Sequence, residues 1–238
     1  MSGHSKWKTI KHKKAAEDAK KSKAYTKIIK EITVAARTGG GDPNHNPTLR
    51  TLLDKAKAIN MPQENATRAI KKGTGELPGI HYEHHQYEGY GPGGMAIIID
   101  VLTDNKNRAV ADIRSLFTRK GGSLAEAGAV SWMFERAGIV RGTSAKLTED
   151  RLLEALIDFD IISIEQDGDH WTITCNPHDL EKIKKAAHDY GLEISEAEVE
   201  MVAKNKHEVP KSQEPMAYEF LDAIDDLDDV QNVYTNIA

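Results

Sequence analysis

The chain has 238 residues, of which 39% are apolar and 29% are charged, as is typical of a water-soluble protein with one large core or a few small ones. Its apolar runs, such as Ala96–Ile99, are too short to cross a bilayer, and the Lys- and His-rich first fifteen positions contain no secretory signal. A single cysteine, Cys175, excludes an internal disulfide framework. We therefore expect a cytoplasmic protein without a membrane partner.

Charge is distributed unevenly along the chain. Residues 1–75 contain 17 Lys and Arg against 6 Asp and Glu, a net charge of +11, whereas the remaining 163 residues carry a net charge of −16. A basic block at one end of an acidic protein predicts a polyanionic partner, and nucleic acid is the commonest one. The acidic remainder would limit nonspecific binding and keep the protein soluble.

The first 75 residues predict a small helical domain behind a flexible basic tip. Within 11–37, an apolar stripe and a cationic stripe fall on separate arcs of about 100° each, the pattern of an amphipathic helix. The apolar stripe comprises Tyr25, Ile28, Ile29, Ile32 and Ala36, and the cationic stripe comprises Lys20, Lys23, Lys27, Lys30 and Arg37. We expect the first stripe to pack in a core and the second to face solvent or a partner. Two shorter helices follow, at 48–59 and from Pro62 to just before Gly73.

The hydrophobic period changes beyond Gly75. Residues 87–94 are rich in glycine and predict a turn, and the apolar run 95–102 predicts a buried strand. A helix is expected at 107–120 and a further strand at 129–134.

A second α/β pattern begins at position 139. Strands are predicted at 139–142, 161–166, 170–175 and 193–202, and helices at 148–159 and 177–190. The pair Asp167-Gly168 marks a hairpin between the second and third of these strands. The resulting order, βαββαβ, is that of a ferredoxin-like domain.

The end of the chain adds a linker at 210–215, a helix and a strand at 230–237. The apolar face of that helix comprises Tyr218, Leu221, Ile224 and Leu227. An isolated helix and strand need partners, and the unit at 80–135 contains only one helix, so we expect the two to complete it.

We therefore predict an α+β protein with three domains. The predicted domains are an N-terminal helical bundle at 1–77, a discontinuous ferredoxin-like domain at 78–137 plus 209–238, and a ferredoxin-like βαββαβ domain at 138–208 that is inserted into the second.

The basic tip and the helix behind it provide the candidate nucleic-acid contacts. Lysine ammonium groups release counterions from phosphates, and a tryptophan can stack on an exposed base. The alternative for a lysine run is a solvated helix face, and for Trp7 it is packing against the helical domain. The candidate residues are Lys6, Trp7, Lys8, Lys11, Lys13, Lys14, Lys20, Lys21, Lys23, Lys27, Lys30 and Arg37.

Other features predict no catalytic chemistry. Gly91–Gly94 lacks the Gly-Lys-Ser/Thr ending of a phosphate loop and predicts a hairpin turn, and Cys175 on a strand predicts a buried inert thiol. His81, His84 and His85 are not followed by further ligands at metal-site spacing. The acids of the last helix that we expect to face water are Asp225, Asp226, Asp228 and Asp229. We predict a protein that is not an enzyme and has no cofactor, metal or small-molecule substrate.

Several long blocks resemble the YebC/PmpR family. They include GHSKWKTIKHKK, KAYTKIIKEI, GGGDPNHNPTLR, YEGYGPGGMAIIIDVLTDNKNR, KGGSLAEAGAVSWMFERAG and DDVQNVYTN. The resemblance implies a helical domain and two α+β domains, with the third inserted into the second, and it implies that Lys6–Arg37 is the nucleic-acid face. The chain departs from the family pattern at Leu156–Gln166, where relatives are usually more acidic, and in its histidine cluster.

The resemblance leaves two functions open. Family members are described as probable cytoplasmic transcriptional regulators that bind DNA, so a DNA-binding transcriptional regulator is the first expectation. Relatives also include a mitochondrial activator of cytochrome oxidase translation and bacterial proteins that relieve ribosomes stalled on proline runs. The alternative is therefore a ribosome-associated translation factor that contacts rRNA, with its acidic α+β domains facing protein partners. Lysines position a nucleic acid but do not specify its bases, which suits shape-based RNA recognition.

Overall fold

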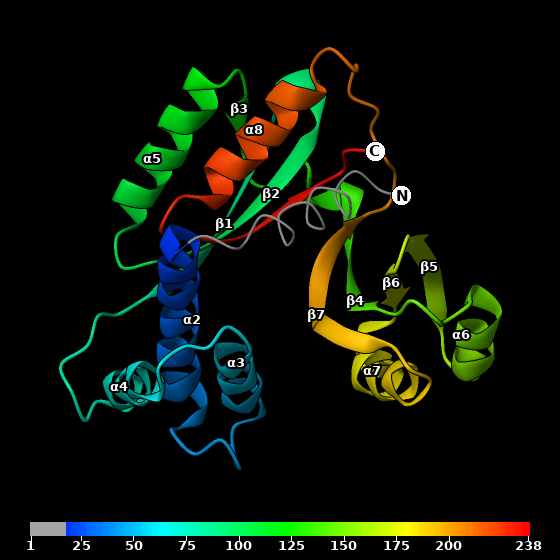
Figure 1. Cartoon of the computed structure of the whole chain (residues 1–238). Helices are drawn as coiled ribbons and strands as arrows, with labels where there is room; N and C mark the ends of the chain where they lie inside the picture. Colours follow the sequence, from blue (N-terminus) through cyan, green and yellow to red (C-terminus); the bar gives the residue numbers. More distant parts are fainter. Residues whose placement is uncertain (1–17) are drawn as a thin grey trace.

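The structure, a computed structural model, describes residues 18–238, with side chains from Ser22 onward. The N-terminal part consists of three helices, α2 (Asp18–Gly39), α3 (Pro47–Ala58) and α4 (Gln63–Thr74), which lie at the lower left of Figure 1. Their shared core is formed by Ile32, Leu49, Leu52, Ala56, Ala66 and Ala69. The apolar stripe predicted for the first helix therefore packs inward, as expected.

Local capping residues define the ends of these helices. The side chain of Asn46 caps α3 by accepting a hydrogen bond from the Leu49 backbone N–H at 3.0 Å, and its amide donates to the Ala35 carbonyl at 2.9 Å. The predicted end of the third helix is wrong, because α4 continues through Gly73 to Thr74. It is followed by Gly75, whose φ of 85° suits glycine. A Cβ atom at position 73 would lie 2.4 Å from the Thr33 carbonyl oxygen, so glycine there allows α4 to pack tightly on α2.

The first sheet is antiparallel and has the strand order β3-β1-β2-β8. Its strands are β1 (Glu83–Tyr90), β2 (Ala96–Thr103), β3 (Ser123–Ala125) and β8 (Val230–Thr235). Helices α5 (Lys106–Arg119) and α8 (Glu214–Asp225) cover one face of this sheet. Between them, the rings of Phe117 and Phe220 pack edge to face, with their centroids 4.9 Å apart. The other face carries no helix of its own and is turned toward α2 and α3 (Figure 1).

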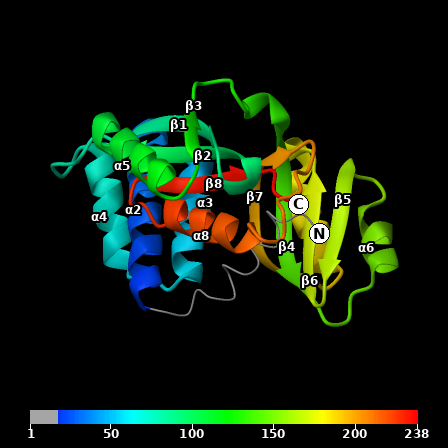
Figure 2. The ribbon, with the colours of Figure 1, turned by 90° about the horizontal axis from the view of Figure 1, so that it is seen from above.

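The second sheet is also antiparallel, with the order β5-β6-β4-β7, and lies beside the first (Figure 2). Its strands are β4 (Phe134–Thr143), β5 (Ile161–Asp167), β6 (His170–Cys175) and β7 (Glu193–Ala203). Helices α6 (Glu149–Leu156) and α7 (Leu180–Asp189) cover one face over a core that includes Val140, Trp171 and Ile183. Three short 3-10 turns complete the structure, at Pro92–Gly94, Ser131–Met133 and Pro177–Asp179.

The structure is thus an α+β protein with a helical N-terminal part and two four-stranded antiparallel sheets. The last strand pairs with β2, for example through Ile97 and Thr235, so it belongs to the first sheet although it follows the second in sequence. The domain boundaries at 77, 137 and 208, and the insertion of the third domain into the second, stay predictions. None of the helices in the described range 18–238 has the length and apolar character of a membrane span.

Two sequence-based predictions around the first sheet are wrong. Residues 83–90 form strand β1, which was not predicted because its side chains are mostly polar, and only Gly91–Gly94 forms the turn. Residues 129–133 form a loop and a 3-10 turn instead of a strand, and only Phe134 of the predicted range lies in a strand, as the first residue of β4. The physical reason is the buried carboxylate of Glu88, which accepts hydrogen bonds from the backbone N–H groups of Gly128, Val130 and Ser131 at 2.7–2.9 Å and so replaces strand pairing there.

Candidate nucleic-acid interface

Only part of the predicted nucleic-acid face lies within the described residues. Outside them are six candidates, Lys6, Trp7, Lys8, Lys11, Lys13 and Lys14. Lys20 and Lys21 belong to α2, but their side chains are not described. The side chains of four candidates on α2 are described, and their contacts show what this face of the helix packs against. They are Lys23, Lys27, Lys30 and Arg37.

The lysines of α2 contact acids from the opposite end of the chain. Lys27 Nζ lies 3.0 Å from an Asp225 carboxylate oxygen, and Lys30 Nζ lies 2.7 Å from an Asp229 carboxylate oxygen. The prediction that the cationic stripe faces solvent or a partner molecule is therefore wrong for Lys27 and Lys30. The prediction that the acids near the end of the chain face water is wrong for Asp225 and Asp229. Helical periodicity gives the direction of a side-chain stripe relative to its own helix, but the covering segment lies about 200 residues further along the chain.

The burial of these ion pairs increases along α2. The Lys23–Asp226 pair, at 3.2 Å, leaves 43% and 61% of the two side chains exposed, whereas the Lys30–Asp229 pair leaves only 8% and 12% exposed. Exposed ion pairs contribute little to stability, but removing one member of a buried pair leaves an uncompensated charge. Lys30 is therefore a structural anchor of α2, whereas Lys23 is held only by an exposed ion pair.

Asp229 is the centre of that anchor. One carboxylate oxygen accepts from Lys30, and the other accepts from the Thr103 hydroxyl and from an Arg108 guanidinium nitrogen, both at 2.9 Å. Burial raises the pKa of Asp229, but the hydrogen bonds from Lys30 and Arg108 outweigh it, so the pKa lies below its ordinary value. Lys30 also lies 5.6 Å from the ring centroid of Tyr82. The carboxylate stays ionised and fixes α2 on the first sheet.

Arg37 is also engaged within the molecule. One guanidinium nitrogen donates to the Ile80 carbonyl oxygen at 2.9 Å, and another is buried without a partner among the described residues. Its position therefore differs from the prediction that this stripe faces solvent or a partner molecule.

A different set of cations in the N-terminal helices remains without a carboxylate partner. Among the described residues, Arg50 on α3 and Arg68, Lys71 and Lys72 on α4 have no Asp or Glu oxygen within 4.0 Å. All except the half-buried Lys72 are exposed. Arg68 and Lys71 border a shallow hollow on the outer side of α4 that Gln63, Thr67 and one acid, Glu64, also line. These residues were not among the predicted contacts, although the helical period of α4 places them away from the buried Ala66, Ala69 and Gly73.

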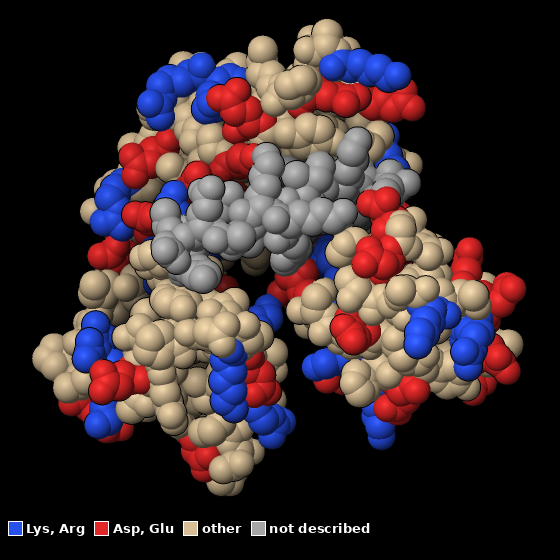
Figure 3. Space-filling view, viewed as in Figure 1, with Lys and Arg blue, Asp and Glu red and all other residues tan. Residues whose placement is uncertain are grey.

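Over the visible face of the N-terminal helices, Lys and Arg atoms are interspersed with Asp and Glu atoms (Figure 3). The basic character of this part of the chain is therefore spread over several small groups of cations on that face.

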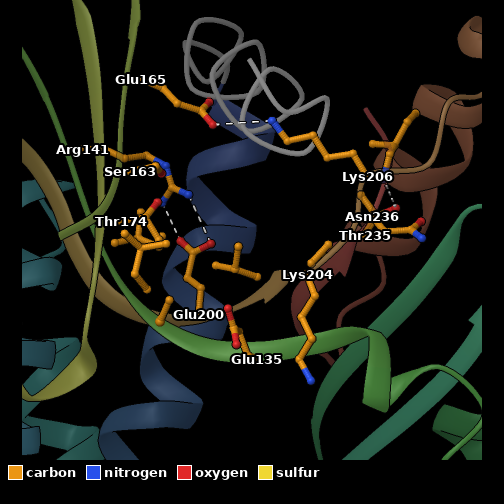
Figure 4. Close-up of a pocket in the computed structure, with 16 residues that line it drawn as sticks. Glu135, Arg141, Ser163, Glu165, Thr174, Glu200, Lys204, Lys206, Thr235 and Asn236 are labelled. Carbon is orange, nitrogen blue, oxygen red and sulfur yellow. Dashed lines mark hydrogen bonds and ion pairs between the residues drawn. The ribbon is translucent and has the colours of Figure 1, made fainter. Parts of the chain in front are cut away.

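Acidic side chains on the second sheet also form ion pairs with cations. On its helix-free face, Arg141 donates to Glu196 at 2.7 Å and to both oxygens of Glu200, and Lys55 of α3 pairs with Glu198. A cavity of about 270 Å³ lies between this face and the end of the chain, where Lys206 reaches to 3.7 Å from Glu165 (Figure 4). The glutamates at 196, 198 and 200 are the one group in the described chain whose carboxylates converge as metal ligands would, and Arg141 and Lys55 already contact them.

The remaining candidate groups do not assemble. His84 and His85 are successive residues of β1, so their side chains point to opposite faces of the strand, and no described set of ligands includes them. Cys175 is fully buried, and burial raises the pKa of its thiol to about 11, so the sulfur is protonated at neutral pH. The prediction of a buried inert thiol is confirmed.

Comparison with known proteins places this architecture in a family. Residues 5–76 match the TACO1/YebC protein N-terminal domain, and residues 82–237 match the TACO1/YebC second and third domain. The chain belongs to the TACO1/YebC family. The resemblance found in its sequence blocks is thereby confirmed.

Similar proteins in this family carry the name of a regulator. A protein of Desulfatibacillum aliphaticivorans, named "Probable transcriptional regulatory protein", is 50% identical over 99% of this chain and 96% of its own length. A protein of Chlorobaculum tepidum with the same description is 49% identical over 100% of this chain and 95% of its own. The crystal structure of a conserved hypothetical protein from Aquifex aeolicus matches the TACO1/YebC fold described here with a TM-score of 0.83 and 37% identity, over 93% of this chain and 91% of that one. This regulator name does not denote a class of enzyme.

Proposed function

We propose that this TACO1/YebC protein is a non-enzymatic, cytoplasmic regulator of gene expression that binds DNA through its N-terminal part. The single observation that carries the proposal is the net charge of +11 in residues 1–75, set against −16 in the rest of the chain. Internal ion pairs remove only part of that charge, because Arg50, Arg68, Lys71 and Lys72 have no carboxylate partner in the described structure. Such cations gain free energy by displacing counterions from phosphates.

The contact surface is proposed to combine two elements. The first is the basic tip with Lys6, Trp7, Lys8, Lys11, Lys13 and Lys14, continued by Lys20 and Lys21 at the start of α2. The second is the outer side of α4 with Arg68 and Lys71, where Gln63 and Thr67 add hydrogen-bonding groups. Lys27 and Lys30 hold α2 in place, and Lys23 lies at the exposed end of the same stripe.

The alternative function is a translation factor that contacts rRNA. One observation favours it: among the described residues, the cations of the N-terminal helices without a carboxylate partner lie on two different helices, Arg50 on α3 and Arg68, Lys71 and Lys72 on α4. Such an arrangement suits recognition of backbone shape better than the reading of base edges in a groove. In that case the acidic second and third parts of the chain would face protein partners or solvent.

The two functions are separated by binding assays with the full chain at near-physiological salt. For a transcriptional regulator, we expect a duplex recovered from cells by crosslinking to bind at least about 10³ times more tightly than a scrambled duplex of equal length. An affinity ratio near one would exclude sequence-specific transcriptional control. Co-sedimentation with ribosomes together with that ratio would support the translation factor, and failure to bind either target would exclude nucleic-acid binding altogether.

A further inference from the structure

A cleft of about 400 Å³ separates the N-terminal helices from the helix-free face of the first sheet. One wall is formed by α2 and the start of α3, with Glu31, Val34 and Leu52, and the other by β1, β2 and β8, with His84, Asp100 and Gln231. Ligand pockets commonly occur between packed units of this kind and combine apolar walls with a few polar groups.

Two polar side chains in this cleft lack the partners that buried groups normally have. Neither the amide nitrogen nor the amide oxygen of Gln231, which is only 8% exposed, has a hydrogen-bond partner in the described structure. The Glu31 carboxylate is half-buried and makes no hydrogen bond or ion pair within 4.0 Å among those residues. Burial raises the pKa of Glu31, against the opposing effect of the more distant Lys55 and Lys27.

The charge of the lining selects the kind of ligand. Glu31 and Asp100 line the cleft from opposite walls, and none of its described lining residues is Lys or Arg. The Asp100 carboxylate accepts from the Gln86 amide at 3.0 Å and from the Tyr234 hydroxyl, and its two oxygens can still accept further hydrogen bonds. A phosphate or carboxylate would be repelled here, whereas a cation with several N–H groups would meet acceptors on both walls.

We propose that this cleft binds a small organic cation, an amine or guanidinium carried on a short apolar stem. The charged head lies between Glu31 and Asp100, with the Gln231 amide oxygen as a further acceptor, and the stem packs on Val34 and Leu52. Such a ligand joins α2 to the first sheet, next to the Lys30–Asp229 anchor. The site is separate from the proposed nucleic-acid surface on α4 and does not depend on it.

The test compares butylguanidinium with butylurea, which has nearly the same shape but no charge. Titration of the full chain by isothermal calorimetry, with amide NMR shifts to locate the site, should show one saturable site for butylguanidinium near Glu31 and Gln231. Butylurea should bind at least about tenfold more weakly, a difference of about 1.4 kcal/mol. Equal binding of both compounds, or no saturation by butylguanidinium at about 10 mM, would overturn the proposal.

Substitutions then test the assigned side chains. Glu31→Gln keeps the shape and removes the charge, and should weaken butylguanidinium binding about tenfold, whereas Glu64→Gln on the exposed side of α4 should leave it unchanged. Equal affinities of these two variants would contradict the placement of the ligand. Gln231→Leu should weaken binding less, and the retained NMR spectrum of the fold distinguishes lost contacts from unfolding.

Discussion

Two groups of cations in the N-terminal part look alike in sequence but have different surroundings. The lysines of α2 dock onto acids at the junction of α8 and β8, with the Lys30–Asp229 pair almost fully buried. Arg68 and Lys71 on α4 have no carboxylate partner among the described residues and are exposed. The density of basic residues therefore does not by itself identify a nucleic-acid surface, because part of that charge is used to hold the molecule together.

The comparison also separates positioning from binding. The buried end of the α2 stripe fixes the orientation of the three N-terminal helices on the first sheet through Lys30, Asp229 and Arg108. The close packing of α4 on α2 at Gly73 then determines where Arg68 and Lys71 point. Under the proposed function, the α2 lysines would influence nucleic-acid binding by placing α4, and the α4 cations would contact the nucleic acid directly.

The largest expected effect is that of Lys30→Glu. It places a second carboxylate against Asp229 in a buried site, so we expect a loss of about 3–5 kcal/mol in the free energy of unfolding. Urea denaturation followed by circular dichroism measures it. The control is Lys185→Glu on the exposed side of α7, where the same charge reversal should change stability by less than about 0.5 kcal/mol. A loss below about 1 kcal/mol at Lys30 would show that the anchor is not a buried pair.

Gly73→Ala tests the packing of α4 on α2. The added methyl group would overlap the Thr33 carbonyl oxygen and the Ala36 side chain, so we expect a net loss of about 1–2 kcal/mol despite the better helix propensity of alanine. Thr67→Ala, on the exposed side of the same helix, is the control in the same denaturation experiment. A Gly73→Ala variant as stable as the control would mean that the two helices are not closely packed.

The Asp229 anchor should make stability depend on acid pH. Because its pKa is lowered in the folded state, its contribution is fully present above the unfolded pKa of about 3.9 and is lost as the pH falls through the folded value. As the pH falls from about 5 to about 3, we expect the free energy of unfolding to decrease more steeply in the wild type than in Asp229→Asn. Parallel pH profiles for the two proteins would argue against the ionised network.

The smallest expected effect is that of Lys23→Glu, at the exposed end of the same stripe. Since both side chains of the Lys23–Asp226 pair are largely in solvent, the loss should be less than about 1 kcal/mol and should shrink further with added salt. A loss as large as that of Lys30→Glu would remove the distinction between the anchored and the loose end of α2.

Periodicity and turn residues predicted most of the fold. The helix α3 and the hairpin between β5 and β6 follow from patterns that are local in sequence. The pairing of the last strand with the first α/β unit joins distant residues, and it was predicted because an isolated helix and strand need partners. Strand β1 was missed because its helix-free face tolerates polar residues such as His84 and Gln86, which weaken the alternation of a strand. The strand expected at 129–134 failed because its backbone N–H groups are bound by the Glu88 side chain, a contact that is 40–43 residues distant in sequence.

The candidate site was harder to predict than the fold. Acids such as Asp229 lie about 200 residues from the lysines that they neutralise, and no local pattern reports which cations will find such partners. Net charge predicts a partner of negative charge, but only the packing of α2, α4 and the C-terminal turn shows which of the described cations remain exposed.

The most direct test of the central claim measures DNA affinity as a function of salt for three forms of the full chain. These are the wild type, the variant Arg68→Glu/Lys71→Glu, and the control Lys185→Glu/Lys211→Glu. The control makes the same change in charge at two exposed lysines outside the N-terminal part, which have no carboxylate partner among the described residues. If Arg68 and Lys71 each contact one phosphate, the slope of log K against log salt should fall by about 2 in the first variant only. Equal slopes for all three proteins would contradict the account.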